Sequence, residues 1–144
     1  MHLRTVAPDA LTEIWPRVLP WIADACRRGT GDQTPADLRL ICRRGEGALI
    51  LICCEDGEPV AAGVTQVRDH RDGARTCWVL AVGGAGARSW LDTLGVIEAN
   101  AARIGCEAVE FVGRPGWARL LPDYEARTSY VRRLGPAAVS QPGL

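Results

Sequence analysis

Residues 76–86 read TCWVLAVGGAG, an apolar run that ends in three glycines. The segment 76–82 contains no charged residue, which is typical of a strand buried on both faces of a sheet. Beyond the glycines, apolar side chains recur at steps of four and three, the spacing of one helix face, at Trp90, Leu94, Ile97, Ala101 and Ile104. This pattern predicts a central strand, a glycine-rich turn and a helix that ends at Gly105.

The glycines of this stretch have two explanations. A glycine-rich turn ahead of a helix lets backbone N–H groups approach a pyrophosphate, and the helix N-terminus favours negative charge. Gly83, Gly84 and Gly86 stand at that junction. Glycines are equally expected in a tight strand-to-helix turn that binds nothing. Both explanations remain open from the sequence.

The rest of the chain supplies elements on both sides of this stretch. A helix with an apolar stripe from Leu11 to Ile22 is either kinked at Pro16 and Pro20 or begins near Pro16. The other hydrophobic runs predict strands at 2–7, 48–54, 60–67, 107–112 and 128–134, and helices at 35–42 and 115–121. The order β-α-α-β-β-β-α-β-α-β predicts an α/β fold with a mixed, mostly antiparallel sheet flanked by helices.

Size and charge restrict the class of protein. The chain has 144 residues, which suits one domain over 1–134 followed by a tail at 135–144. Its 17 basic and 17 acidic residues cancel, so no global field attracts nucleic acid or an anionic membrane. No apolar run approaches the length of a membrane span, and the first residues lack the apolar core of a signal peptide. We therefore expect an intracellular protein.

The six cysteines give no sign of a metal or thiol site. No CxxC motif occurs, and the two histidines lack the spacing of metal ligands. Cys53 and Cys54 are adjacent in a predicted strand, so their side chains point to opposite faces and cannot chelate one ion. We expect no metal and interpret the cysteines as small buried hydrophobic residues.

The element order over residues 2–134 resembles the GNAT superfamily of N-acyltransferases. The resemblance implies that the strands at 76–82 and 107–112 splay apart and that acyl-CoA lies in the V between them. The family's turn pattern is Gln or Arg, two residues, Gly, any residue, then Gly or Ala; with Gly84 and Gly86 as its glycines, the first position falls on Ala81. The pattern is half met, and Arg88 is a partial substitute for the missing polar residue. If CoA binds, the implied contacts are Val82, Gly83, Gly84, Gly86 and Arg88.

Three short strings carry a closer resemblance to GNAT-like proteins encoded by tailed phages and prophages. They are RIGC at 103–106, GRPGW at 113–117 and LLPDY at 120–124. Such proteins include structural and virion-associated components, so this resemblance implies protein contacts in place of catalysis.

The residues that GNAT chemistry uses are missing from their usual positions. Amine acetylation needs a base to take the ammonium proton and an acid to protonate the leaving thiolate. The central strand contains no carboxylate, and the position implied for the family's tyrosine falls near Arg119 and Leu120, neither of which can act as that acid. Glu110 and Tyr124 are the remaining candidates, although Glu110 suits an ion pair with an arginine and Tyr124 suits the core.

The absence of the base and the acid from their usual positions favours an assembly or virion-associated protein of a phage or prophage, with no cofactor. Its partners would be proteins of a larger complex that engages the tail at 135–144. The alternative is an acetyl-CoA-dependent N-acetyltransferase that acts on an unidentified amine.

Overall fold

The computed structural model describes residues 1–29, 32–84, 90–112, 117–127 and 130–135. The chain forms two compact units, Met1–Gly113 and Arg114–Leu144. The first contains the sheet and its covering helices, and the two units are described separately.

The first unit is built on a five-stranded sheet in the order β1-β2-β3-β4-β5. The strands are β1 (His2–Val6), β2 (Ala48–Cys53), β3 (Pro59–Asp69), β4 (Arg75–Gly84) and β5 (Ala108–Glu110). The first four strands pair antiparallel, and β5 runs parallel to β4. This arrangement confirms the predicted mixed, mostly antiparallel sheet.

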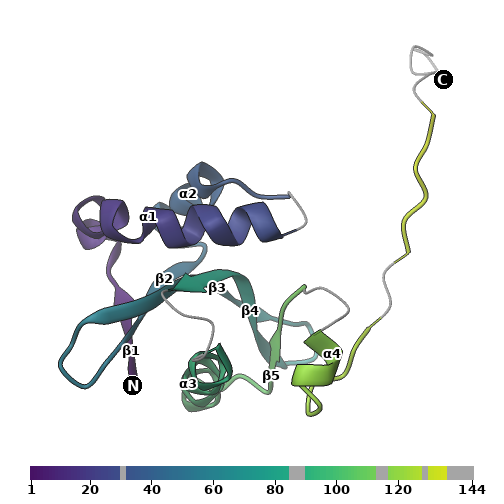
Figure 1. Cartoon of the computed structure of the whole chain (residues 1–144). Coiled ribbons are helices and arrows are strands. Elements are labelled where there is room, and N and C mark those ends of the chain that lie inside the picture. Colours follow the sequence, from purple (N-terminus) through teal and green to yellow (C-terminus); the bar gives the residue numbers. More distant parts are fainter. Residues whose placement is uncertain (30–31, 85–89, 113–116, 128–129, 136–144) are drawn as a thin grey trace. The chain divides into compact units, whose positions relative to one another are not determined.

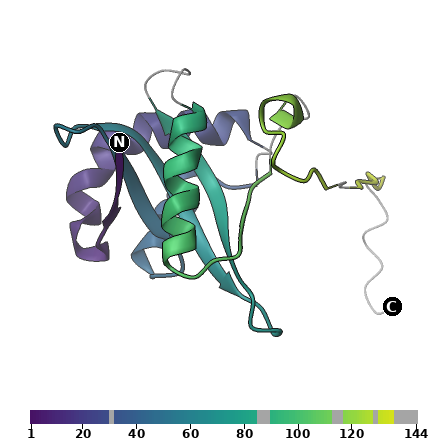
Figure 2. The same cartoon turned by 90° about the horizontal axis from the view of Figure 1, so that it is seen from below.

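Helices cover both faces of the sheet (Figure 1). A short 3-10 turn, η1 (Pro8–Ala10), leads into α1 (Leu11–Arg28), which is followed by α2 (Pro35–Arg43). These helices lie on one face, and α3 (Trp90–Arg103) crosses the opposite face, as Figure 2 shows.

Burial of one face keeps α1 continuous despite its two prolines. The helix begins at Leu11, so the alternative in which it begins near Pro16 is wrong. A proline inside a helix removes one backbone hydrogen bond. The predicted apolar stripe is buried against the sheet along its length, which offsets that loss; its members are Leu11, Trp15, Val18 and Ile22.

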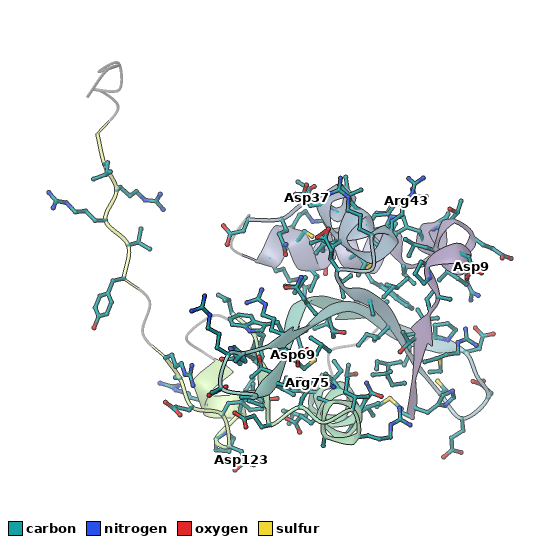
Figure 3. All side chains as sticks on the ribbon, turned by 180° about the vertical axis from the view of Figure 1, so that it is seen from behind. Asp9, Asp37, Arg43, Asp69, Arg75 and Asp123 are labelled. Carbon is teal, nitrogen blue, oxygen red and sulfur yellow. The ribbon has the colours of Figure 1, made fainter. Side chains whose placement is uncertain are left out.

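A capping box fixes the start of α2, where Asp37 is labelled in Figure 3. The Thr34 hydroxyl accepts a hydrogen bond from the Asp37 N–H at 3.2 Å, and the Asp37 carboxylate accepts one from the Thr34 N–H at 2.9 Å. The Thr34 backbone N–H, with a smaller effect of the Thr34 hydroxyl, lowers the pKa of the Asp37 carboxyl. The polar loop before α2 is thereby held in place beside the end of α1.

The core has one layer on each face of the sheet, because side chains alternate along β2. Leu49, Leu51 and Cys53 pack toward α1 and α2. Ile50 and Ile52 pack on the other face, where Ile97 of α3 joins them. Cysteine behaves as predicted in three positions, since Cys42, Cys53 and Cys77 are buried.

The second unit contains α4 (Trp117–Leu120), inside the predicted helix at 115–121. After it, the Tyr124 N–H donates to the Leu121 carbonyl at 3.0 Å. The prediction of a strand at 128–134 is wrong for residues 130–134, which form no strand. Tyr130 and Val131 favour strand geometry, yet a strand needs a neighbour to pair with, and these side chains are 91% and 76% exposed. The predicted tail at 136–144 lies outside the described residues.

Candidate functional site

Strands β4 and β5 separate soon after they meet. They pair over three positions, Thr76 with Ala108, Cys77 with Val109 and Trp78 with Glu110. On its other edge β4 stays paired with β3 as far as Gly84. From Val79 onward, the edge of β4 that faces β5 has no strand partner in the described part of the chain. The predicted strand at 107–112 is shortened to Ala108–Glu110 by this divergence.

A β-bulge lies where the two strands separate. Thr65 pairs with Val79 and Val64 pairs with Ala81, so Leu80 is the extra residue on β4. Leu80 and Ala81 consequently pack toward the same face, the α1 side of the sheet. A bulge bends its strand and leaves backbone groups beside it without ladder partners. Such groups are available to a ligand that enters between β4 and β5.

A groove of about 400 Å³ opens beside the bulge on the α1 side of the sheet. Its walls come from the end of α1, the loop before α2, strands β3 and β4, and the residue pair that follows β5. The lining residues are Ala25, Cys26, Gly29, Asp32, Gln33, Arg68, Trp78, Val79, Leu80 and Val112. The groove is therefore mixed in character, with one acidic and one basic side chain among apolar ones.

A stacked pair forms the polar part of the groove. The guanidinium carbon of Arg68 lies 4.4 Å from the centroid of the Trp78 ring. The Arg68 Nε donates to the Gln66 side-chain oxygen at 3.0 Å, and the Gln66 amide donates to the Glu46 carbonyl at 3.0 Å. Stacking and hydrogen bonding together hold the guanidinium over the strand. The sequence analysis missed this pair, which the alternation of Gln66 and Arg68 across from Trp78 could have revealed once the hairpin register was known.

The predicted phosphate-binding glycines are described in part. Gly83 and Gly84 were predicted in the turn, and this prediction is wrong. Both lie at the end of β4, where Gly83 pairs with Ala62 and Gly84 pairs with Ala61. A Cβ atom on Gly83 would lie 2.5 Å from the Trp21 carbonyl oxygen of α1, so helix packing alone requires glycine there. Of the other candidates, Val82 packs on the α3 side of β4. Gly86 and Arg88 lie outside the described residues.

The two catalytic candidates are found in different units. Glu110 is partly buried and is the last paired residue of β5, opposite Trp78. Tyr124 is partly buried in the second unit, after α4. Their roles as base and acid stay predictions. Strand β4 itself carries no carboxylate that could take the place of either.

The thiols near the site are held in their protonated form. Burial raises the pKa of Cys77 to about 11. Burial, with a smaller effect of the Asp37 charge, also raises the pKa of Cys26 in the groove. Because the thiolate is the nucleophilic form, neither residue is suited to attack at neutral pH. Within the described residues, no three His, Cys, Asp or Glu side chains gather as a metal site.

Comparisons with known proteins place this geometry in a class. No protein-family model matches the chain, and no curated protein matches it by sequence. A structure of a probable acetyltransferase is similar with a TM-score of 0.63 and 11% identity, over 96% of this chain and 99% of that one. A ribosomal-protein-alanine N-acetyltransferase from Brucella melitensis biovar Abortus 2308 gives 0.61 and 14%, over 93% and 100%. An aminoglycoside acetyltransferase from an uncultured soil metagenomic sample, in complex with sisomicin, gives 0.65 and 9%, over 92% and 94%.

These likenesses define the fold, which is that of the GNAT acetyltransferases. The separation of β4 from β5 matches what the resemblance to that superfamily implied. None of these three structures is described as a phage or prophage protein, so the closer resemblance to phage-encoded proteins gains no support. The described residues include no helix long and apolar enough to cross a membrane.

Proposed function

We propose that this protein binds an acyl-CoA thioester between β4 and β5 and transfers its acyl group to an amine. The observation that carries the proposal is the separation of these strands at the bulge around Leu80. The free edge of β4 runs from Val79 to Gly84, and an extended pantetheine arm can bind there by hydrogen-bonding to backbone groups. The similar structures named above are acetyltransferases, which is consistent with this use of the edge.

The residues present fit the thioester end of the ligand. The edge of β4 beside the bulge has no strand partner in the described part of the chain, and backbone N–H groups on such an edge suit a carbonyl oxygen that gains negative charge during acyl transfer. The amine nitrogen forms a bond to the acyl carbon, the carbon–sulfur bond breaks, and the amine proton leaves to solvent or a neighbouring base. Since β4 has no carboxylate, Glu110 at the opening is the nearest acidic residue by register to serve as that base.

The assembly role is the competing proposal, and acetyl-CoA separates the two. That role was suggested by the missing catalytic base and acid, by short sequence strings and by a tail outside the described residues. A scaffold retained only for protein contacts has no reason to keep affinity for the thioester. An acyltransferase should bind acetyl-CoA with a dissociation constant of order micromolar, about −8 kcal/mol.

Isothermal titration calorimetry of the full chain with acetyl-CoA tests the proposal. We expect micromolar binding and amine-dependent release of free CoA. Arg88→Glu should weaken binding about tenfold, because it places a negative charge where the pyrophosphate is expected at the start of α3. Arg71→Glu is the matched control, since Arg71 is exposed in the turn at the far end of β4. Absence of binding and of melting-temperature shift at millimolar acetyl-CoA would overturn the proposal in favour of the assembly role.

A further inference from the structure

The groove beside the bulge contains one basic residue, Arg68, which forms no ion pair among the described residues. Several arginines of the first unit have carboxylate partners: Arg27 and Arg28 both lie 2.9 Å from Asp24, and Arg75 lies 2.7 Å from Asp69 (Figure 3). Arg68 differs from them. Within the described residues its guanidinium contacts the Trp78 ring and the Gln66 amide, and no carboxylate lies within ion-pair distance.

The contacts of Arg68 leave part of its guanidinium group accessible to a ligand. Its Nε is occupied by Gln66, and within the described residues no hydrogen bond engages the four N–H donors of its two terminal nitrogens. The guanidinium carbon lies 4.4 Å from the Trp78 ring centroid, and the Arg68 side chain is exposed, so a ligand can reach it. A planar edge with two parallel N–H groups matches a carboxylate, which can accept both in a bidentate contact.

The Arg68–Trp78 pair lies beside the point where β4 and β5 separate. Trp78 is the last β4 residue that pairs with β5, and Leu80 of the bulge lies two residues further along the same groove wall. At about 400 Å³, the groove falls near the lower end of the range for small-molecule sites. This volume suits a ligand of amino-acid size.

We propose that the groove binds a small amine that also carries a carboxylate, such as a free amino acid, with the carboxylate on Arg68. The assignment of this ligand as acyl acceptor rests on the proposed acyltransferase function. Its binding does not, because the Arg68–Trp78 pair is formed by side chains of this chain alone. Asp32, the one acidic residue of the lining, gives the groove a charge opposite to that of Arg68. A groove with both charges is complementary to a zwitterion.

Matched pairs of ligands test the proposal without acyl-CoA. L-phenylalanine is compared with 2-phenylethylamine, and L-lysine with cadaverine, by calorimetry on the full chain. We expect at least one amino acid to bind tenfold or more tightly than its decarboxylated counterpart. Arg68→Gln should remove that preference, Arg68→Lys should restore part of it, and Arg71→Gln should leave it unchanged. Arg68 is exposed, so an unchanged melting temperature of Arg68→Gln verifies that the variant is folded.

The outcomes separate this proposal from the previous one. Equal binding of acid and decarboxylated amine, a preference that survives Arg68→Gln, or no binding at millimolar concentration each overturns carboxylate recognition. Loss of acetyl-CoA binding with retained amino-acid preference would leave the groove as a binding site and remove the transferase. Acetyl-CoA binding without a preference for the amino acid over its decarboxylated amine would support the transferase and overturn carboxylate recognition.

Discussion

Single residues in this protein show how closely backbone and side-chain space are matched. Gly83 lets the carbonyl of Trp21 in α1 approach the end of β4, and a Cβ there would meet that oxygen at 2.5 Å. Gly95 within α3 has open space around the same position. A change of glycine to alanine therefore meets a steric clash at Gly83 and open space at Gly95.

Alanine at these glycines should have effects of opposite sign. Gly83→Ala forces α1 and β4 apart and should lower the free energy of unfolding by about 1–3 kcal/mol. Gly95→Ala removes backbone freedom from the unfolded chain at a helical site and should raise it by roughly 0.5–1 kcal/mol. Urea unfolding of both variants measures the difference. Equal stability of Gly83→Ala and the parent protein would show that α1 is not held against β4 as described.

At the level of single residues, the sequence predicts the buried face of a helix but not contacts that depend on strand register. Leu94, Ile97 and Ala101 of the predicted apolar face of α3 are buried, whereas Ile104, predicted with them, is exposed just after the helix ends at Arg103. Their period of three and four is a property of the helix alone. Leu80 was not predicted as a bulge, because an extra residue in a ladder depends on the register of two strands. The stacking of Arg68 on Trp78 depends on that same register.

Elements begin and end where local polar groups satisfy the backbone. The helix predicted at 35–42 is confirmed as Pro35–Arg43, and the capping box of Thr34 and Asp37 sets its start. The strand predicted at 128–134 shows the opposite case. Its composition favours a strand, but strand formation needs a partner, and no partner is encoded in the local sequence.

The capping box makes α2 sensitive to acid. The pKa of Asp37 is lowered in the folded protein from its ordinary value of 3.8, mainly by the Thr34 backbone N–H. A carboxylate with a lowered folded pKa adds stability above its unfolded pKa, and that stability is lost as the pH falls through the folded value. Asp37→Asn should therefore be less stable than the parent at pH 7, and the gap should close below about pH 4. Urea midpoints at both pH values measure the gap; a constant gap would contradict the role of the charge.

The molecule as a whole combines a predictable scaffold with a site that depends on tertiary register. Element order and hydrophobic period were sufficient for the mixed sheet and for helices on both its faces. The groove required α1, the loop before α2 and the ends of three strands to meet. No local sequence pattern specifies that these segments lie together, so the groove could be identified only from the structure.

The brief pairing of β4 with β5 has a consequence for how the molecule moves. Strands β1 to β4 share long antiparallel ladders, whereas β5 is joined by three residue pairs after a crossover through α3. Contacts across such a crossover form late in folding and open first by local unfolding. Amide hydrogens of 108–110 should accordingly exchange with deuterium faster than those of 49–52 in β2, and equal protection would contradict this. The edge that opens most readily is then the one at which a ligand would enter.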